Sequence, residues 1–379
     1  MLYLHIPFCQ SRCIYCDFYS TTASATWRPR FVEALVRELH RRSDYLPAAE
    51  AGTTNLRPLR SVYFGGGTPS QLTDDEVERV FGAIRDVFAI QPQTEVTFEA
   101  NPDDITPQRV AALRQLGVNR VSLGVQSFSD PLLRLLRRRH SAEGARHAVE
   151  MLVEGGIENV SIDLIYGLPQ QSLEDFKRDC REALSLPVSH LSSYALSVEP
   201  DTPLGRMVAA GTLQPADEDL TLAQYEALLE ATEKAGFDHY EISNFCRPGC
   251  EARHNSGYWQ GIPYLGLGPG AHSFSGTSRR FNLPDLRAYC QAQADVPHET
   301  ETLSLTARVN EFTFTALRTR QGLDLQQLRE RFGKDIADAV RREARRSLAG
   351  GLLEAHGDTL RLTRQGLFVS NDVMSDLMI

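Results

Sequence analysis

The chain has 379 residues, of which 42% are hydrophobic and 23% charged, and its formal net charge is −9. This composition is typical of a soluble globular protein and excludes the disordered, collagen-like and disulfide-scaffold classes. The negative charge argues against nucleic acid as the main partner, because phosphate binding needs a basic surface. No apolar run approaches the roughly 18 residues of a membrane span, and the first residues lack a signal-peptide pattern, so we expect a cytoplasmic protein.

Short β-rich runs alternate with longer amphipathic patterns along most of the chain. The predicted strands are residues 2–6, 61–64, 94–99, 119–124, 159–166, 190–196 and 239–243. The predicted helices are residues 28–41, 74–88, 107–116, 129–139, 141–154, 172–186 and 217–235. This alternation predicts a parallel α/β sheet or barrel, and several strands are apolar enough for burial on both faces.

Two irregular stretches interrupt this pattern. Residues 43–60, rich in Pro, Ala, Gly and Thr, predict a surface loop, and the polar residues 275–303 predict a linker. Beyond the linker, residues 307–318, 324–332 and 334–349 predict helices, and residues 351–354 and 359–363 predict a hairpin. We therefore expect two domains, residues 1–290 and residues 291–379, of which the second is helical and winged-helix-like.

Three of the seven cysteines crowd into the spacing Cys9-x3-Cys13-x2-Cys16, directly after the first strand. In a reducing compartment such spacing indicates metal or redox chemistry before disulfides. Three thiolates on one loop can bind three irons of a [4Fe–4S] cluster and leave the fourth iron open. The alternatives are a zinc knuckle, which needs a fourth ligand such as His5, or three unrelated thiols.

The segment Cys9-Gln-Ser-Arg-Cys13-Ile-Tyr-Cys16 resembles the signature of the radical S-adenosylmethionine (SAM) superfamily. The resemblance implies a partial (β/α)6 barrel and a [4Fe–4S] cluster bound by these cysteines, whose open iron chelates SAM. In that superfamily one electron from the cluster cleaves the sulfonium to give a 5′-deoxyadenosyl radical. The protein supplies ligation and orientation for this chemistry.

Further candidate residues follow at the ends of later strands. A glycine triplet precedes Thr68, and glycine lets backbone approach a ligand closely. Polar side chains at the carboxyl ends of barrel strands share one face, where they can bind hydroxyl, amino or carboxylate groups. Their order resembles the coproporphyrinogen-dehydrogenase branch of the superfamily. This implies a SAM site of Tyr3, Tyr15, Gly66, Gly67, Thr68, Glu99, Gln126, Asp163 and, from a helix, Arg138.

Three features resemble the HemW-type haem chaperones of this branch. Phe18 stands where the dehydrogenases carry a further cysteine, and the chain lacks the segment that precedes their first strand. The hexapeptide from His254 to Trp259 resembles an HNxxYW motif linked to haem in the chaperones. The resemblance implies that His254, Tyr258 and Trp259 bind haem, since imidazole ligates haem iron and aromatic faces pack on porphyrin.

Several alternatives stay open. His140, His239 and His272 are further candidate haem ligands. A rival function is an oxygen-independent coproporphyrinogen III oxidase, which decarboxylates porphyrinogen propionates. Another is a radical SAM enzyme for a different substrate in which Cys246 and Cys250 bind extra metal, although this pair lacks a partner pair. We assign no catalytic residue. The expected partners are haem and haem-accepting respiratory apo-proteins, not nucleic acid, while dimerisation, membrane contact and the identity of the acceptor stay open.

Overall fold

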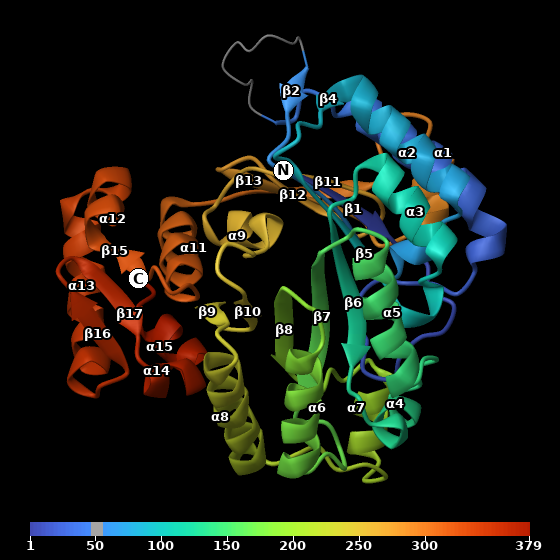
Figure 1. The fold of residues 1–379 in the computed structure, drawn as a ribbon. Helices are drawn as coiled ribbons and strands as arrows, with labels where there is room; N and C mark the ends of the chain where they lie inside the picture. Colours follow the sequence, from blue (N-terminus) through green and yellow to red (C-terminus); the bar gives the residue numbers. More distant parts are fainter. Residues whose placement is uncertain (47–55) are drawn as a thin grey trace.

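The computed structural model describes residues 1–46 and 56–379, and its centre is a curved sheet (Figure 1). The strands of this sheet are β1 (Leu2–Ile6), β3 (Ser61–Gly66), β5 (Glu95–Ala100), β6 (Arg120–Gln126), β7 (Asn159–Tyr166), β8 (His190–Ala195), β9 (Asp238–Glu241), β10 (Asn244–Cys246) and β11 (Leu265–Leu267). Among the described residues their order is β11-β1-β3-β5-β6-β7-β8-β10-β9. The strands from β11 to β8 run parallel, and β10 and β9 are antiparallel additions at one edge. The sheet is thus an open, partial barrel, as predicted.

Helices cover the outer face of the sheet (Figure 1). They are α1 (Ser24–Arg41), α2 (Asp74–Val87), α3 (Pro107–Leu116), α5 (Ala142–Glu154), α6 (Leu173–Ser185) and α8 (Glu218–Lys234), with short 3-10 turns at Pro69–Gln71 and Pro102–Asp104. Two further helices, α4 (Asp130–Leu135) and α7 (Pro203–Ala209), lie instead against the loop that follows β1, where the backbone of Ile14 hydrogen-bonds Leu136 and Leu204. The local sequence determines where several of these helices begin. Thr73 and Glu76 form a reciprocal capping box for α2, and Ser172 and Asp175 do the same for α6.

The two faces of the sheet differ in polarity. Along β6, Val121, Leu123 and Val125 are fully buried in the apolar core beneath the helices. The alternate residues Arg120 and Ser122 line a cavity on the inner face. Because successive side chains of a strand point to opposite faces, this period of two separates core from cavity. The expectation of strands buried on both faces therefore holds for β6, where Arg120 and Ser122 are also buried, but its inner face is polar and not apolar.

The predicted linker at residues 275–303 is wrong. This stretch holds β13 (Ser278–Asn282), α10 (Leu286–Gln291) and β14 (His298–Thr302), and β12 (His272–Phe274) completes a three-stranded antiparallel sheet. Every residue of β14 is exposed, so the stretch carries too few apolar residues to signal a strand. Tertiary contacts hold it instead: the buried Tyr289 donates a hydrogen bond to Glu38 Oε2 at 2.7 Å.

The predicted loop at residues 43–60 contains β2 (Arg57–Pro58), which pairs with β4 (Phe88–Ala89). Residues 47–55 of that prediction lie outside the described residues. A short helix, α9 (Arg253–Trp259), was not predicted and carries the hexapeptide that begins at His254.

The C-terminal helices and hairpin are confirmed. They are α11 (Leu305–Leu317), α12 (Leu325–Phe332), α13 (Lys334–Ala349), β16 (Leu353–His356) and β17 (Thr359–Leu362), with β15 (Leu323–Asp324) beside β17 and α14 (Arg364–Phe368) and α15 (Ser370–Asp376) at the end. They surround a separate apolar core, of which Val309 on α11 is a member. This unit lies beside α8 and β9 (Figure 1), with the Ile242 amide bonded to the Arg318 carbonyl at 3.1 Å. The division at residue 290 stays a prediction.

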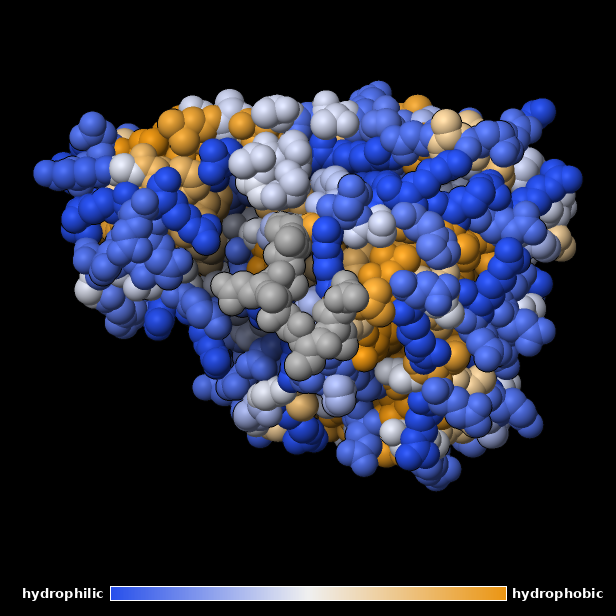
Figure 2. All heavy atoms as spheres, turned by 90° about the horizontal axis from the view of Figure 1, so that it is seen from above, coloured by the Kyte–Doolittle hydropathy of each residue, from blue (hydrophilic) through white to orange (hydrophobic). Residues whose placement is uncertain are grey.

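The face of the molecule seen from above is mostly polar (Figure 2). Figure 2 shows a largely hydrophilic face on which apolar side chains gather in separate patches, one of them over the C-terminal unit at the left. No helix in the described part of the chain is both long and apolar enough to cross a membrane.

Candidate cofactor site

The inner face of the sheet and the loop after β1 enclose a cavity of about 740 Å³. Strands and loops that are far apart in the sequence contribute its walls. The predicted site residues that line it are Tyr3, Cys9, Cys13, Tyr15, Cys16, Gly66, Gly67, Thr68, Glu99, Gln126, Arg138, Asp163, His254 and Tyr258. The structure thus brings together the predicted cysteine, SAM and haem residues in one place, with the exception of Trp259.

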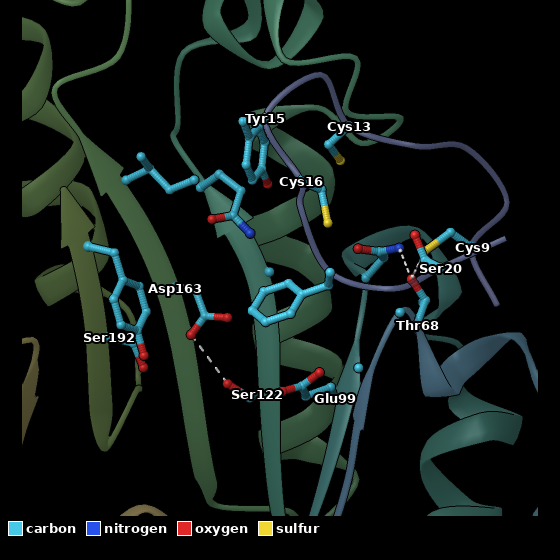
Figure 3. A pocket seen from close by; sticks show the side chains of 18 of the residues that line it. Cys9, Cys13, Tyr15, Cys16, Ser20, Thr68, Glu99, Ser122, Asp163 and Ser192 are labelled. Carbon is cyan, nitrogen blue, oxygen red and sulfur yellow. Dashed lines mark hydrogen bonds between the residues drawn. The ribbon is translucent and has the colours of Figure 1, made fainter. Parts of the chain in front are cut away.

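The cysteine loop is fixed to the rest of the domain at several points. The Cys9 amide donates to the Thr21 carbonyl at 2.9 Å, which closes the base of the loop. At its middle, Ile14 is buried, and its carbonyl accepts a hydrogen bond from the Leu204 amide at 2.8 Å. Figure 3 shows the side chains of Cys9, Cys13 and Cys16 projecting from this loop into the cavity. The loop therefore presents three free thiols to one space.

Polar groups surround these thiols. Thr68 Oγ1 donates to Cys9 Sγ at 3.4 Å, and Arg138 Nη1 donates to Cys13 Sγ at 3.4 Å. Burial raises the pKa of Cys9, and it raises the pKa of Cys16 to about 11. Burial thus favours the protonated form of Cys9 and Cys16, and a bound metal must displace that proton, because the thiolate is the metal-binding form.

The donor set fits a polynuclear cluster better than a single ion. Among the described residues, no three His, Cys, Asp or Glu side chains converge as ligands of one metal ion. His5, the fourth ligand of the zinc alternative, has both ring nitrogens engaged, with the Tyr3 hydroxyl at 3.1 Å and the Tyr19 carbonyl at 2.9 Å. In a [4Fe–4S] cluster each thiolate binds a different iron, so the sulfurs need not converge on one point.

The segment at the end of β3 requires glycine for steric reasons. Gly66 has a φ of 106°, and a Cβ at this position would lie 2.6 Å from Nδ1 of His5. A Cβ on Gly67 would lie 2.9 Å from the Ile6 carbonyl oxygen. Since neither position accepts a side chain, bare backbone faces the cavity next to Thr68, where a ligand can approach it closely.

Two acidic side chains lie deeper in the cavity. Glu99, on β5, accepts a hydrogen bond from the Tyr63 hydroxyl at 2.6 Å, and Asp163, on β7, accepts one from Ser122 at 3.3 Å (Figure 3). Burial raises the pKa of Glu99 to about 7 and that of Asp163 to about 6. These carboxyl groups can accept hydrogen bonds from ligand hydroxyl or amino groups.

Arg138 was predicted within a helix, and this is wrong. Helix α4 ends at Leu135, Arg137 takes a left-handed φ of 58°, and the Arg138 amide bonds the Leu133 carbonyl at 2.8 Å. This is the Schellman pattern of a helix end. It turns Arg138 toward the cavity, where Nη2 donates to Asn101 Oδ1 at 2.6 Å. A buried guanidinium beside the cysteine loop can pair with a ligand carboxylate.

His254 forms part of a closed hydrogen-bond chain. Its Nδ1 lies 2.8 Å from Ser61 Oγ and its Nε2 lies 2.8 Å from the Tyr258 hydroxyl. Burial lowers its pKa to about 3, so the ring is neutral. The rings of Tyr63 and Tyr258 each lie 5.0 Å from it, centre to centre. In this arrangement His254 has no free nitrogen for iron and instead holds Tyr258 against the cavity.

Trp259 is placed elsewhere. Its indole stacks with the guanidinium of Arg318, 4.7 Å from the ring centre, at the border with the C-terminal unit. Trp259 does not line the cavity.

The other candidate ligands differ in accessibility. His140 is buried with Nε2 on the Val125 carbonyl at 3.0 Å, and Nε2 of His239 meets the Ile242 carbonyl at 3.2 Å. Neither lines the cavity. His272 is exposed and borders a second, smaller hollow. No described group of three metal-ligand side chains includes Cys246 or Cys250, so the geometry adds nothing to the idea of a second metal site there.

Sequence reasoning missed several cavity residues. They are Tyr63, Arg120, Ser122, His190, Ser192, Tyr194 and Asn244. Most stand at alternate positions of the parallel strands, so polar residues recurring with a period of two would have revealed them. His190 repeats the arrangement of His254, with Ser161 Oγ at 2.7 Å and the Tyr240 hydroxyl at 2.8 Å from its ring nitrogens.

Comparison with known proteins agrees with this geometry. A family model for the radical SAM superfamily matches residues 3–183, and one for the HemN C-terminal domain matches residues 303–369. A curated Mycobacterium tuberculosis protein named heme chaperone HemW is 39% identical, covering 100% of this chain and 94% of its own. A Lactococcus lactis protein of the same name is 32% identical, covering 100% and 97%.

Among solved structures, the radical SAM enzyme coproporphyrinogen III oxidase (HemN) from Escherichia coli has the same fold. The two structures match with a TM-score of 0.84 at 21% sequence identity. The match covers 100% of this chain and 89% of that chain. The match extends over the C-terminal unit, as the family models do. The cysteine loop, the open parallel sheet and the sequence identity to HemW proteins over the full length show that the chain belongs to the radical SAM superfamily and, within it, to the HemW family.

Proposed function

We propose that this protein is a haem chaperone: it binds haem and delivers it to respiratory apo-proteins in the cytoplasm. The observation that carries the proposal is that three cysteines and the polar strand ends line one cavity, in a chain 39% identical over its length to a protein named heme chaperone HemW. Membership of the radical SAM superfamily supports a resident [4Fe–4S] cluster and SAM.

In this proposal Cys9, Cys13 and Cys16 hold the cluster. When bound, the cluster supplies one-electron chemistry and an open iron for SAM. Gly66, Gly67 and Thr68 receive the SAM amino group along the bare backbone of β3.

The remaining SAM contacts come from the deeper cavity wall. Glu99 and Asp163 accept hydrogen bonds from ribose hydroxyls, and Arg138 pairs with the methionine carboxylate. Tyr3, Tyr15 and Gln126 complete the surface that contacts the nucleoside.

Haem would bind beside the cysteine loop, against aromatic residues that line the cavity. Tyr258 offers its ring to the porphyrin, and His254 holds that ring in place through its 2.8 Å hydrogen bond. Phe18 contributes a second aromatic face, since 63% of its surface is exposed next to the cysteine loop. An apolar ring at this position replaces the additional cysteine that the resemblance assigns to the oxidases, which favours cargo binding over porphyrinogen decarboxylation.

The test reconstitutes the protein with iron and sulfide without oxygen and then measures two activities. We expect about four irons per chain, a Soret band that saturates on titration with haem, and no turnover of coproporphyrinogen III with SAM and reductant. Formation of protoporphyrinogen would establish the oxidase alternative. Absence of haem binding by the cluster-loaded protein would refute the chaperone proposal.

A further inference from the structure

A second hollow of about 330 Å³ lies beside the main cavity. Aromatic and imidazole rings make up most of its wall, which consists of Tyr3, His5, Asp17, Phe18, Tyr19, Tyr258, Tyr264, Gly270 and His272. Tyr3, Asp17, Phe18 and Tyr258 line both spaces, so the two hollows share a wall. Anything bound in the second hollow therefore lies next to the cysteine loop.

His272 differs from the other nine histidines of the chain, all of which lie in the described residues. It is the one whose two ring nitrogens both lack a hydrogen bond or ion pair with a described residue. Its side chain is exposed, and its ring borders the hollow. A neutral imidazole with free nitrogens is the usual protein ligand for haem iron.

The ring of His272 is also held in position. It meets the ring of Phe281 edge to face at 4.7 Å, and the two residues oppose each other across the antiparallel pair β12–β13. Burial of part of the side chain lowers its pKa, which favours the neutral imidazole that can bind metal. The imidazole is therefore fixed in place while its nitrogens stay free.

The rest of the wall suits a large aromatic plane. Tyr258 and Tyr264 pack edge to face at 4.7 Å, and the exposed Phe18 flanks the opening. Aromatic faces and a free imidazole together match a metalloporphyrin better than an aliphatic ligand or a simple metal ion. Because the hollow is small, it favours a haem that contacts the protein along one edge and one face over a haem that is fully enclosed. The rest of the porphyrin then stays open to a recipient protein.

We propose that His272 is the axial ligand of the haem cargo, which docks on the aromatic wall formed by Phe18, Tyr258 and Tyr264. This inference rests on the proposed haem binding and assigns the iron ligand to β12, outside the hexapeptide of α9. His254 then acts as a positioning residue for Tyr258.

The experiment titrates ferric haem into cluster-loaded wild type, His272→Ala, His254→Ala and His356→Ala under oxygen-free conditions. His356 is an exposed histidine of the C-terminal hairpin that contacts Glu354, so its variant is the matched control. We expect His272→Ala to weaken haem binding at least about tenfold and to shift the Soret band. Added imidazole restores the band, and His272→Met gives a bound haem with a different Soret position.

The outcomes separate the two proposals. If wild type binds no haem, the chaperone function fails. If wild type binds haem and His272→Ala keeps the same affinity and Soret position, haem binding stands and the assignment of His272 is wrong. A folded His254→Ala protein that loses the axial-ligand spectrum while His272→Ala retains it would assign the iron to His254 instead. Far-UV circular dichroism of each variant shows which of them are folded.

Discussion

His254 and Tyr258 form one hydrogen-bonded unit, in which Nε2 of the imidazole and the tyrosine hydroxyl lie 2.8 Å apart. Ser61 occupies the other ring nitrogen, so the histidine of the HNxxYW hexapeptide is satisfied without any ligand. We predict that His254→Ala lowers the free energy of unfolding by about 2–4 kcal/mol, because the Ser61 and Tyr258 hydroxyls lose their buried partner. Urea denaturation measures this loss. A stability equal to that of wild type would show that the hydrogen-bond chain is not structural.

We expect that all three loop cysteines are needed to bind the iron–sulfur cluster. We predict that Cys13→Ala reduces bound iron from about four atoms per chain to near zero after anaerobic reconstitution, because three ligands are needed to hold the cluster. Cys290→Ala is the control, since Cys290 is buried in α10 and does not line the cavity. Iron and sulfide analysis with the visible absorption spectrum gives the answer. Full iron content in Cys13→Ala would contradict the assignment of the loop.

Gly66 should not tolerate even a methyl group. Its φ of 106° is strained for other residues, and an added Cβ would press on the His5 ring. We predict that Gly66→Ala costs about 1–3 kcal/mol of stability and weakens SAM binding.

Gly82, in the middle of α2, provides the comparison for this substitution. A Cβ there would meet nothing within 4 Å, so Gly82→Ala should be neutral or stabilise the protein by up to about 1 kcal/mol. Thermal unfolding and isothermal calorimetry with SAM distinguish the two variants. Equal behaviour of both would show that the backbone at Gly66 is not constrained.

Glu99 makes stability depend on pH. Burial raises the pKa of Glu99 to about 7 from the ordinary value of 4.5, so the native state holds this proton more tightly than the unfolded chain. The resulting stabilisation is complete below the unfolded pKa and is lost as the pH rises through the native pKa. We predict that Glu99→Gln removes about 1–3 kcal/mol of this pH dependence between about pH 4.5 and 7, while Gln can still accept the Tyr63 hydrogen bond.

Urea unfolding of SAM-free protein at several pH values across this window provides the measurement. The wild-type curve should fall with rising pH more steeply than the Glu99→Gln curve. Parallel curves would mean that Glu99 titrates at its ordinary pKa and is not desolvated.

The local parts of this structure could be predicted from the sequence, and the long-range parts could not. β1 and β7 match their predicted bounds because apolar runs and turn residues mark them locally. The cysteine spacing likewise carries its chemistry within eight residues. By contrast, β14 carries no apolar residue, and the six-residue α10 is held by contacts made far away in the sequence, such as that between Tyr289 and Glu38.

The candidate site shows the same division. Its predicted residues came from motifs and strand ends, whereas Tyr63 and Arg120 lie on β3 and β6 away from the carboxyl ends of these strands, where only their alternation with core residues marks them as cavity residues. Trp259 belongs to the same hexapeptide as His254 but turns to Arg318, because side chains on a short helix point in different directions. The free nitrogens of His272 could not be predicted from the sequence either, because hydrogen-bond partners depend on side-chain positions.

Transfer of haem from the loaded protein to an acceptor measures the proposed chaperone function itself. The cluster-loaded protein, charged with one equivalent of haem, is mixed without oxygen with the apo-form of a b-type respiratory cytochrome, and the absorption spectrum of the acceptor is followed. We predict that the acceptor gains its holo spectrum while the donor loses its Soret band, and that haem-loaded Cys13→Ala transfers less. If haem stays on the donor, or reaches the acceptor no faster from the protein than from free haem, the protein is not a haem chaperone.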